Sequence, residues 1–137
     1  MSLSDLAGNY KGEGELWLDP KGNDALTYAC SMTVTATSIA YEWEHEGEKH
    51  TGTITPDGSA CTWQDSFHHA QPVLCSAEGA PNGAALKVLC TYDAAGQTWG
   101  WRMQLATRPD GTIVLGMTNV TPWGEEGRAV RMAFARA

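Results

Sequence analysis

The segment from Trp63 to Pro72 holds the side chains best suited to chemistry. The carboxyl group of Asp65 is followed by two adjacent imidazoles, His68 and His69. An imidazole changes charge near neutral pH, and a carboxylate that orients it lets it take up or release a proton. The segment therefore suggests an acid–base site in which Asp65 orients His68 or His69.

Two other interpretations of this segment compete with acid–base chemistry. A metal ion could be bound by the same three side chains together with His45 or His50. Adjacent histidines on an extended strand point in opposite directions, so both could bind one ion only across a turn. In the simplest interpretation, Asp65 accepts hydrogen bonds from backbone N–H groups of a loop, and the histidines are solvated. Because the spacing assembles no nucleophile, base and oxyanion donor, we predict no catalytic residue, metal or cofactor.

A second segment of interest runs from Met117 to Arg128. Asn119 shares a strand face with Met117, and the chain then turns through Thr121-Pro122-Trp123-Gly124 into the last strand. Trp123 in this turn could close one end of a barrel or gate a pocket, and we favour closure.

The two-residue alternation within strands predicts which side chains point inward. Glu42, Glu44 and Glu46 share one face of their strand, and three aligned carboxylates must be solvated. The opposite face therefore points inward. Arg131 alternates with apolar neighbours on the last strand, so we expect it outside. If the opposite face of that strand pointed inward, Arg131 would stand among alanines and could bind a carboxylate ligand. The inward side chains predicted to contact a ligand are Tyr28, Tyr41, Trp43, Trp63, Trp99, Trp101 and Met117, with Asp65, His68 and Asn119 as polar contacts.

The elements that position these side chains are predicted to be short strands. Gly, Pro and Asp recur between runs of about 8–12 residues rich in Thr, Val, Ile, Tyr and Trp, which is typical of an all-β barrel or sandwich. The predicted strands are Gly8–Leu18, Leu26–Ala36, Ser38–Glu46, Lys49–Thr55, Ser59–Asp65, Val73–Glu78, Ala84–Tyr92, Thr98–Thr107, Thr112–Asn119 and Glu126–Ala135, after a helical turn in Ser2–Ala7.

Short connections between these strands favour hairpins, and a sheet of so many twisted strands tends to close on itself. Closure also removes exposed strand edges. The 137 residues fit one domain, and no linker divides them. We therefore predict a single all-β domain over residues 1–137, an antiparallel up-and-down β-barrel of about 8–10 strands. A two-layer sandwich is the alternative.

Composition and charge exclude several classes of partner. The net charge is −7 and the arginines are scattered singly, whereas nucleic-acid binders gather basic residues on one face. Anionic membrane surfaces are disfavoured for the same reason. The sequence shows no apolar run long enough to cross a bilayer and no signal peptide. We therefore predict a cytoplasmic protein whose widely spaced cysteines, Cys30, Cys61, Cys75 and Cys90, are reduced thiols.

Three motifs resemble those of calycin-type barrels, a group that includes lipocalins. Gly8-Asn9-Tyr10-Lys11-Gly12 is similar to their Gly-x-aromatic-x-Gly start. Trp63-x-Asp65-Ser66-Phe67-His68, together with the run from Thr118 to Glu126, resembles an uncharacterised bacterial family of calycin-like proteins. The resemblance spans nearly the whole chain and implies a barrel with no established reaction.

The chain departs from better-known calycins at three places. Pro20–Ala25 is too short for the lid helices of fatty-acid-binding barrels, and Arg131-Met132-Ala133 replaces their carboxylate-binding Arg-x-Tyr. Nitrobindin-like barrels bind haem through a late histidine, and here no histidine follows His69. The resemblance therefore implies neither fatty-acid clamping nor haem.

Together these features predict a non-enzymatic barrel that binds a small apolar or amphipathic molecule, because such pockets combine an aromatic lining with few polar groups. One alternative is a hydrolase or isomerase that uses Asp65 and His68 or His69 at the barrel mouth. The other is a structural or oligomerising barrel with a filled core, for which a homodimer is one possible assembly.

Overall fold

The computed structural model describes residues 2–19, 23–69 and 71–137. The elements in chain order are η1 (Leu3–Leu6, a 3₁₀ helix), β1 (Gly8–Trp17), β2 (Ala25–Val34), β3 (Ile39–His45), β4 (Glu48–Asp57), β5 (Ala60–Asp65), β6 (Val73–Ala77), β7 (Leu86–Ala94), β8 (Gln97–Thr107), β9 (Ile113–Val120) and β10 (Glu126–Arg136). The predicted strands and the N-terminal helical turn are confirmed. Residues 20–22 lie outside the described residues, so the absence of lid helices in Pro20–Ala25 stays a prediction.

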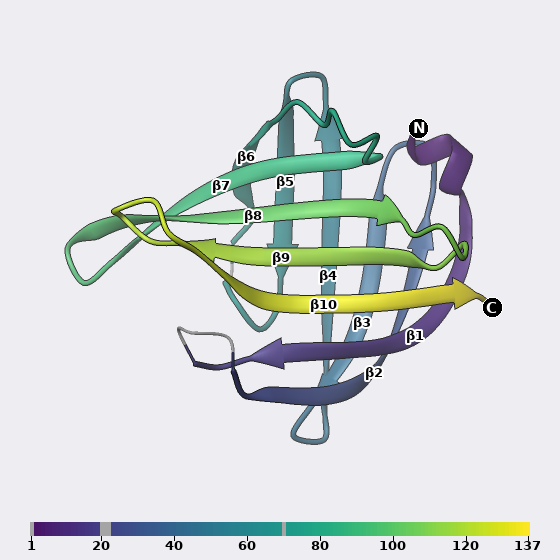
Figure 1. The fold of residues 1–137 in the computed structure, drawn as a ribbon, viewed down its shortest axis with the longest axis horizontal. Helices are drawn as coiled ribbons and strands as arrows, with labels where there is room; N and C mark the ends of the chain where they lie inside the picture. The colour runs from purple at the N-terminus through teal and green to yellow at the C-terminus, as the bar shows by residue number, and fades with distance from the viewer. Residues whose placement is uncertain (1, 20–22, 70) are drawn as a thin grey trace.

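The strands form a closed antiparallel ring in the order β1-β10-β9-β8-β7-β6-β5-β4-β3-β2. Each strand pairs with its neighbour in sequence, and the ladder between β1 and β10 closes the ring, from Tyr10–Arg136 to Leu16–Val130. In Figure 1, β7–β10 run across the view and β3–β5 cross behind them nearly at right angles. The predicted up-and-down barrel is confirmed, and a sandwich with free edges is excluded because the edge strands pair with each other.

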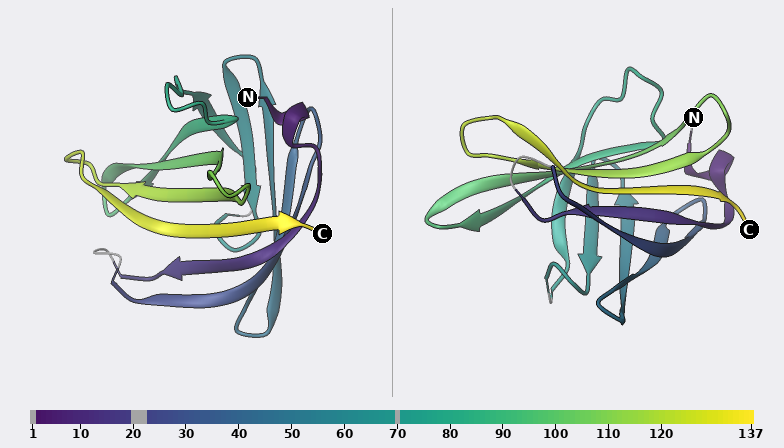
Figure 2. Two further views of the ribbon diagram at one scale, coloured as in Figure 1. Left: turned by 45° about the vertical axis from the view of Figure 1, so that its right-hand side comes forward. Right: turned by 60° about the horizontal axis from the view of Figure 1, so that its bottom comes forward.

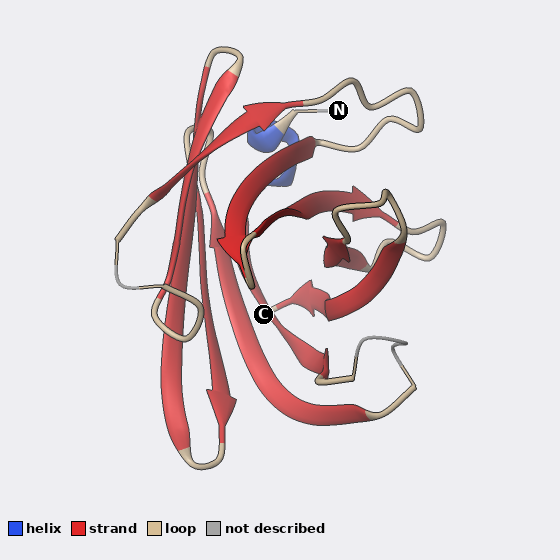
Figure 3. Cartoon of the chain, turned by 90° about the vertical axis from the view of Figure 1, so that its left-hand side faces the viewer, coloured by secondary structure: helices blue, strands red, loops and turns tan. Residues whose placement is uncertain are grey.

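The two ends of the barrel differ. The helix η1 packs onto one end through the buried Leu3 and Leu6, and the Tyr10 hydroxyl donates to the backbone oxygen of Leu6 at 2.5 Å. The C-terminus lies at this closed end (Figure 2), where the Ala137 N–H donates to the Asn9 oxygen near the start of β1 at 2.9 Å. The odd-numbered strands end at the opposite end, which we call the mouth. Figure 3 views the barrel from the side of the β7–β8 and β9–β10 connections.

The inward faces follow the predicted alternation. Tyr41 and Trp43 on β3 are each 2% exposed, while Glu42 and Glu44, which alternate with them, are exposed. Arg131 lies outside, as expected, and its Nε and Nη2 donate to Glu15 Oε1 at 3.0 and 2.8 Å. The side chains that fill the interior of the barrel include Ile39, Ile54, Met103, Leu105, Leu115, Met132 and Phe134.

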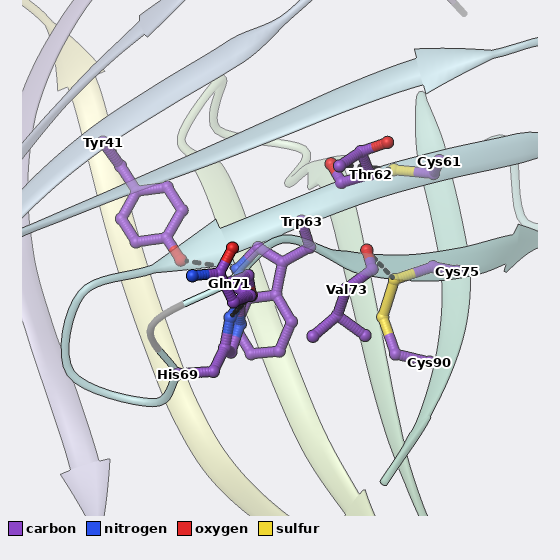
Figure 4. Close-up of a disulfide and its surroundings, with 9 residues drawn as sticks. All are labelled: Tyr41, Cys61, Thr62, Trp63, His69, Gln71, Val73, Cys75 and Cys90. Atoms are coloured by element: carbon purple, nitrogen blue, oxygen red, sulfur yellow. Dashed lines mark hydrogen bonds between the residues drawn. A yellow bond between two sulfur atoms is a disulfide. The ribbon is translucent and has the colours of Figure 1, made fainter.

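A disulfide between Cys75 and Cys90 corrects the expectation that all four cysteines are reduced. These residues are direct partners in the β6–β7 ladder, with 4.2 Å between their Cα atoms (Figure 4). Cys30 and Cys61 are free and buried, as predicted. The sequence does not reveal the pair because the partners are 15 residues apart and only the strand register opposes them. The expectation of reduced cysteines rested on the absence of a recognisable signal peptide, and the cytoplasmic location stays a prediction.

The barrel wall has an opening at its mouth end beside β6, which we call the side window. The β6–β7 ladder has three residue pairs and begins at Cys75–Cys90. Beyond Cys90, the described β7 residues pair only with β8, and this hairpin projects from the barrel (Figure 1). The disulfide therefore joins β6 to β7 at the rung that borders the side window.

In the described part of the chain, no helix is long and apolar enough to cross a bilayer.

Reduction of the Cys75–Cys90 disulfide is expected to destabilise the fold. Closing a loop of this length restricts the unfolded chain and stabilises the folded one by about 3 kcal/mol. Urea denaturation with and without reductant measures the difference, and thiol titration under denaturing conditions should rise from two groups to four. The control Cys61→Ala removes a buried free thiol and should keep the reductant-dependent difference. Equal stability of the oxidised and reduced proteins would contradict this assignment.

Candidate functional site

The buried carboxylate of Asp65 lies at the mouth end of β5 and is 1% exposed. Its Oδ2 accepts a hydrogen bond from the Tyr41 hydroxyl at 2.7 Å and one from Trp43 Nε1 at 3.4 Å. Its Oδ1 accepts a third from the Phe67 N–H at 2.9 Å. A buried carboxylate is costly unless it is hydrogen-bonded, and these three donors satisfy that requirement.

Strand register explains how Tyr41 reaches Asp65 across β4. Gly52 on β4 pairs with Tyr41 on one side and with Asp65 on the other. Because Gly52 has no side chain, the Tyr41 ring can lie over its backbone, where a Cβ atom would overlap the ring. Trp63 Nε1 then donates to the Tyr41 hydroxyl at 2.9 Å (Figure 4). Burial, reinforced by the Asp65 charge, raises the pKa of Tyr41 well above its ordinary value of 10.0, so this hydroxyl remains a donor.

The three interpretations of the Asp65 segment can now be compared. The loop interpretation is correct for Asp65. Its carboxylate accepts a hydrogen bond from the Phe67 N–H, and its backbone oxygen accepts hydrogen bonds from the N–H groups of His68 and His69 at 3.1 Å each. It is wrong for the histidines, whose Nε2 atoms are buried. Among the described residues, neither imidazole is hydrogen-bonded to the Asp65 carboxylate, so the geometry does not favour the acid–base dyad.

Metal ligation finds no support in the described residues either. No group of three or more His, Cys, Asp or Glu side chains among them is arranged to hold a metal ion. His45 and His50 instead pack around Phe67, with ring centroids 5.2 and 5.1 Å from it.

A pocket of about 520 Å³ opens at the barrel mouth, and we call it the mouth pocket. Trp99 and Trp101 on β8 form one wall, and Asn119 on β9 lies beside them. Its aromatic lining consists of Trp17, Phe67, His68, Trp99, Trp101 and Trp123. Trp123 is 63% exposed and meets Trp99 edge-on, with ring centroids 6.0 Å apart. It therefore stands at the rim of the pocket, and its exposure does not fit the closure of the barrel end that the sequence favoured.

A second pocket of about 230 Å³ occupies the side window. His68 and Trp101 line both pockets and so form their common wall. Trp63 lies parallel to Trp101, with an angle of 8° between the planes and 5.7 Å between the centroids. The remaining lining includes His69, Val73, Cys90 and Tyr92.

The two histidines of the common wall and the side window are held differently. Burial lowers the pKa of His68 below its ordinary value of 6.5; the Asp65 charge opposes this effect, and His69 and His50 add to it. His69 Nδ1 lies 2.6 Å from the Gln71 backbone oxygen (Figure 4). Because that oxygen can only accept, His69 Nδ1 must carry the proton, and in the neutral ring Nε2 has a free electron pair.

The ligand contacts predicted from the sequence divide into three groups. Trp63, His68, Trp99, Trp101 and Asn119 line the mouth pocket or the side window. Tyr41, Trp43 and Asp65 form the hydrogen-bonded cluster next to them, and Tyr28 packs on Trp43 with centroids 5.2 Å apart. Met117 is 1% exposed in the core and lines neither pocket.

Sequence reasoning missed several pocket residues. Tyr92 alternates with the inward Cys90, so strand parity could have placed it, and its hydroxyl donates to Asn119 Oδ1 at 2.6 Å. Phe67 lies in the loop after β5, where alternation carries no information, and so does His69, which the sequence suggested only for acid–base chemistry or metal binding.

Comparison with known proteins adds no assignment to this geometry: no family model matches the chain, and no curated protein matches its sequence.

The substitution Gly52→Ala is expected to destabilise the protein by about 1–3 kcal/mol, because the new methyl group overlaps the buried Tyr41 ring. Displacing that ring also weakens its bond to Asp65. The matched control Gly116→Ala lies in another strand and meets open space, so its stability should change by no more than about 0.5 kcal/mol. Urea denaturation measures both variants, and equal effects would show that Gly52 does not position Tyr41.

Acidification is expected to destabilise the protein through His68. Because folding lowers its pKa, the unfolded chain binds the proton more readily, and stability present above pH 6.5 is lost as the pH falls below it. One such group contributes at most about 1.4 kcal/mol per pH unit. Denaturation of the wild type and His68→Gln between pH 7.5 and 5 should show a smaller pH dependence in the variant. An NMR titration midpoint of His68 at or above 6.5 would contradict this.

Proposed function

We propose that this protein is a calycin-like barrel that binds a small, mostly apolar or amphipathic molecule at its mouth. The observation that carries the proposal is the mouth pocket of about 520 Å³ with its aromatic lining. This volume lies within the roughly 300–1,000 Å³ usual for small-molecule sites, which combine apolar walls with a few polar groups. The closed ring of strands with crossing layers supports the calycin-like assignment.

The division of the interior between the two ends supports a site at the mouth in particular. Toward the closed end, Leu105, Leu115 and Phe134 are each at most 1% exposed and belong to one continuous core. Toward the mouth, the inward positions of β8 carry Trp99 and Trp101, which border the pocket. The ligand therefore binds among the mouth aromatics rather than along the whole lumen.

The enzyme alternative receives less support. The Asp65 carboxylate is occupied by Tyr41, Trp43 and the Phe67 N–H, so it does not orient an imidazole as a general base requires.

Saturable binding of an uncharged fluorophore tests the proposal. Nile red should bind with one-to-one stoichiometry, quench tryptophan emission, and lose about 10-fold in affinity in Trp99→Ala, because one aromatic wall of the pocket is removed. The matched control is Leu74→Ala, which removes a side chain that is 74% exposed on the outside of β6; it should leave the affinity unchanged. Absence of saturable binding, or binding that Trp99→Ala leaves intact, would favour the structural barrel instead.

A further inference from the structure

Four buried nitrogen atoms at the mouth have no hydrogen-bond partner. Among the described residues, the buried side-chain nitrogen and oxygen atoms in this condition are His68 Nε2, His69 Nε2, Trp99 Nε1 and Trp101 Nε1. All four residues line the mouth pocket or the side window. Buried polar atoms are nearly always paired, so four unpaired atoms around one pair of pockets indicate that the partner is a bound molecule.

The other buried tryptophans of the site provide the contrast. Trp43 Nε1 donates to Asp65, and Trp63 Nε1 donates to Tyr41. The protein thus pairs the indole N–H groups of the Asp65 cluster internally and leaves unpaired the buried N–H groups of Trp99 and Trp101, two residues that line the mouth pocket. Trp101 is 8% exposed, so its N–H is withdrawn from bulk solvent.

The chemical type of these atoms restricts the ligand. An indole N–H can only donate, so Trp99 and Trp101 require acceptor atoms on the partner. His69 Nε2 offers an electron pair, because its Nδ1 proton is directed at the Gln71 oxygen. Two residues of the mouth pocket therefore carry unpaired obligate donors, and one residue of the side window carries an unpaired acceptor.

The charges around the pockets further restrict the ligand. Carboxylates and phosphates are usually bound by guanidinium or ammonium groups. Here the donors are uncharged indoles, and the guanidinium of Arg128 at the rim is placed over the Trp17 ring at 4.4 Å. The buried Asp65 charge lies close to His68, and Glu125 lines the rim. The carboxylates of Asp65 and Glu125 both disfavour the binding of an anion.

We propose that the mouth pocket binds an uncharged aromatic molecule that carries hydrogen-bond acceptors of the carbonyl type, received by the indole N–H groups of Trp99 and Trp101. This deepens the proposed function and rests on it. The flat body of the ligand packs against the aromatic lining, since offset stacking and edge-on contacts both favour planar rings. An anion would leave its own charge uncompensated in this pocket. A plain hydrocarbon would leave the indole donors without acceptors.

A set of tricyclic probes of nearly equal size tests this on the wild-type protein. Fluorenone carries one carbonyl, fluorene carries none, and fluorene-9-carboxylate is an anion. Calorimetry and tryptophan quenching should show fluorenone binding about 3- to 10-fold more tightly than fluorene, which corresponds to one net hydrogen bond, and the carboxylate binding most weakly. In ¹⁵N-edited NMR spectra, fluorenone but not fluorene should shift the indole N–H signal of Trp99 or Trp101 downfield.

Variants assign the effect to the indole groups. Trp101→Phe and Trp99→Phe, singly and together, keep aromatic rings and should remove the preference for fluorenone while fluorene still binds. The control Trp43→Phe removes an indole N–H that is already bonded to Asp65, so the preference should persist. Near-ultraviolet circular dichroism verifies that each variant is folded.

The outcomes separate the two proposals. Equal binding of fluorene and fluorenone, or tightest binding of the carboxylate, overturns the inference about ligand chemistry but leaves the binding barrel in place. A fluorenone preference that survives in the double variant also overturns the inference. If none of the probes and no Nile red binds, the proposed function itself fails.

Discussion

The buried carboxylate of Asp65 holds the mouth of this barrel together. It accepts hydrogen bonds from Tyr41 and Trp43 on β3 and from the loop that follows β5, and so it links β3 to the end of β5, two strands that are not neighbours in the sheet. Its backbone oxygen also accepts the N–H groups of His68 and His69. These contacts place both imidazoles on the pocket walls. The aspartate is therefore a positioning group, and the chemistry available to a ligand lies in the aromatic and imidazole nitrogens around it.

Two local features of the sheet make room for that arrangement. Gly52 leaves space for the Tyr41 ring to cross β4, and the short ladder between β6 and β7 leaves the side window open. The Cys75–Cys90 disulfide crosses the last rung beside this window. It limits how far β6 and β7 can separate, so it secures the wall where hydrogen bonding between the strands ends.

The pairing of polar groups distinguishes the mouth from the rest of the interior. At the closed end Tyr10 donates to the backbone of Leu6, and in the Asp65 cluster each polar group has a partner within the protein. The unpaired nitrogens gather at the pockets. Desolvated donors without partners cost stability, and binding sites are where proteins retain such local costs.

The sequence alone determined the strands and the faces they present, and it favoured closure into a barrel over a two-layer sandwich. Alternation of Glu42 and Glu44 with Trp43 arises from the pleat of a single strand, and Gly, Pro and Asp at the turns act within a few residues, so both can be recognised locally. Only the tertiary structure decided that Cys75 meets Cys90, that Tyr41 bonds to Asp65 across Gly52, and which indole N–H groups stay unpaired. These contacts depend on the register between strands and on closure of the ring, so the spacing of the residues in the sequence does not predict them.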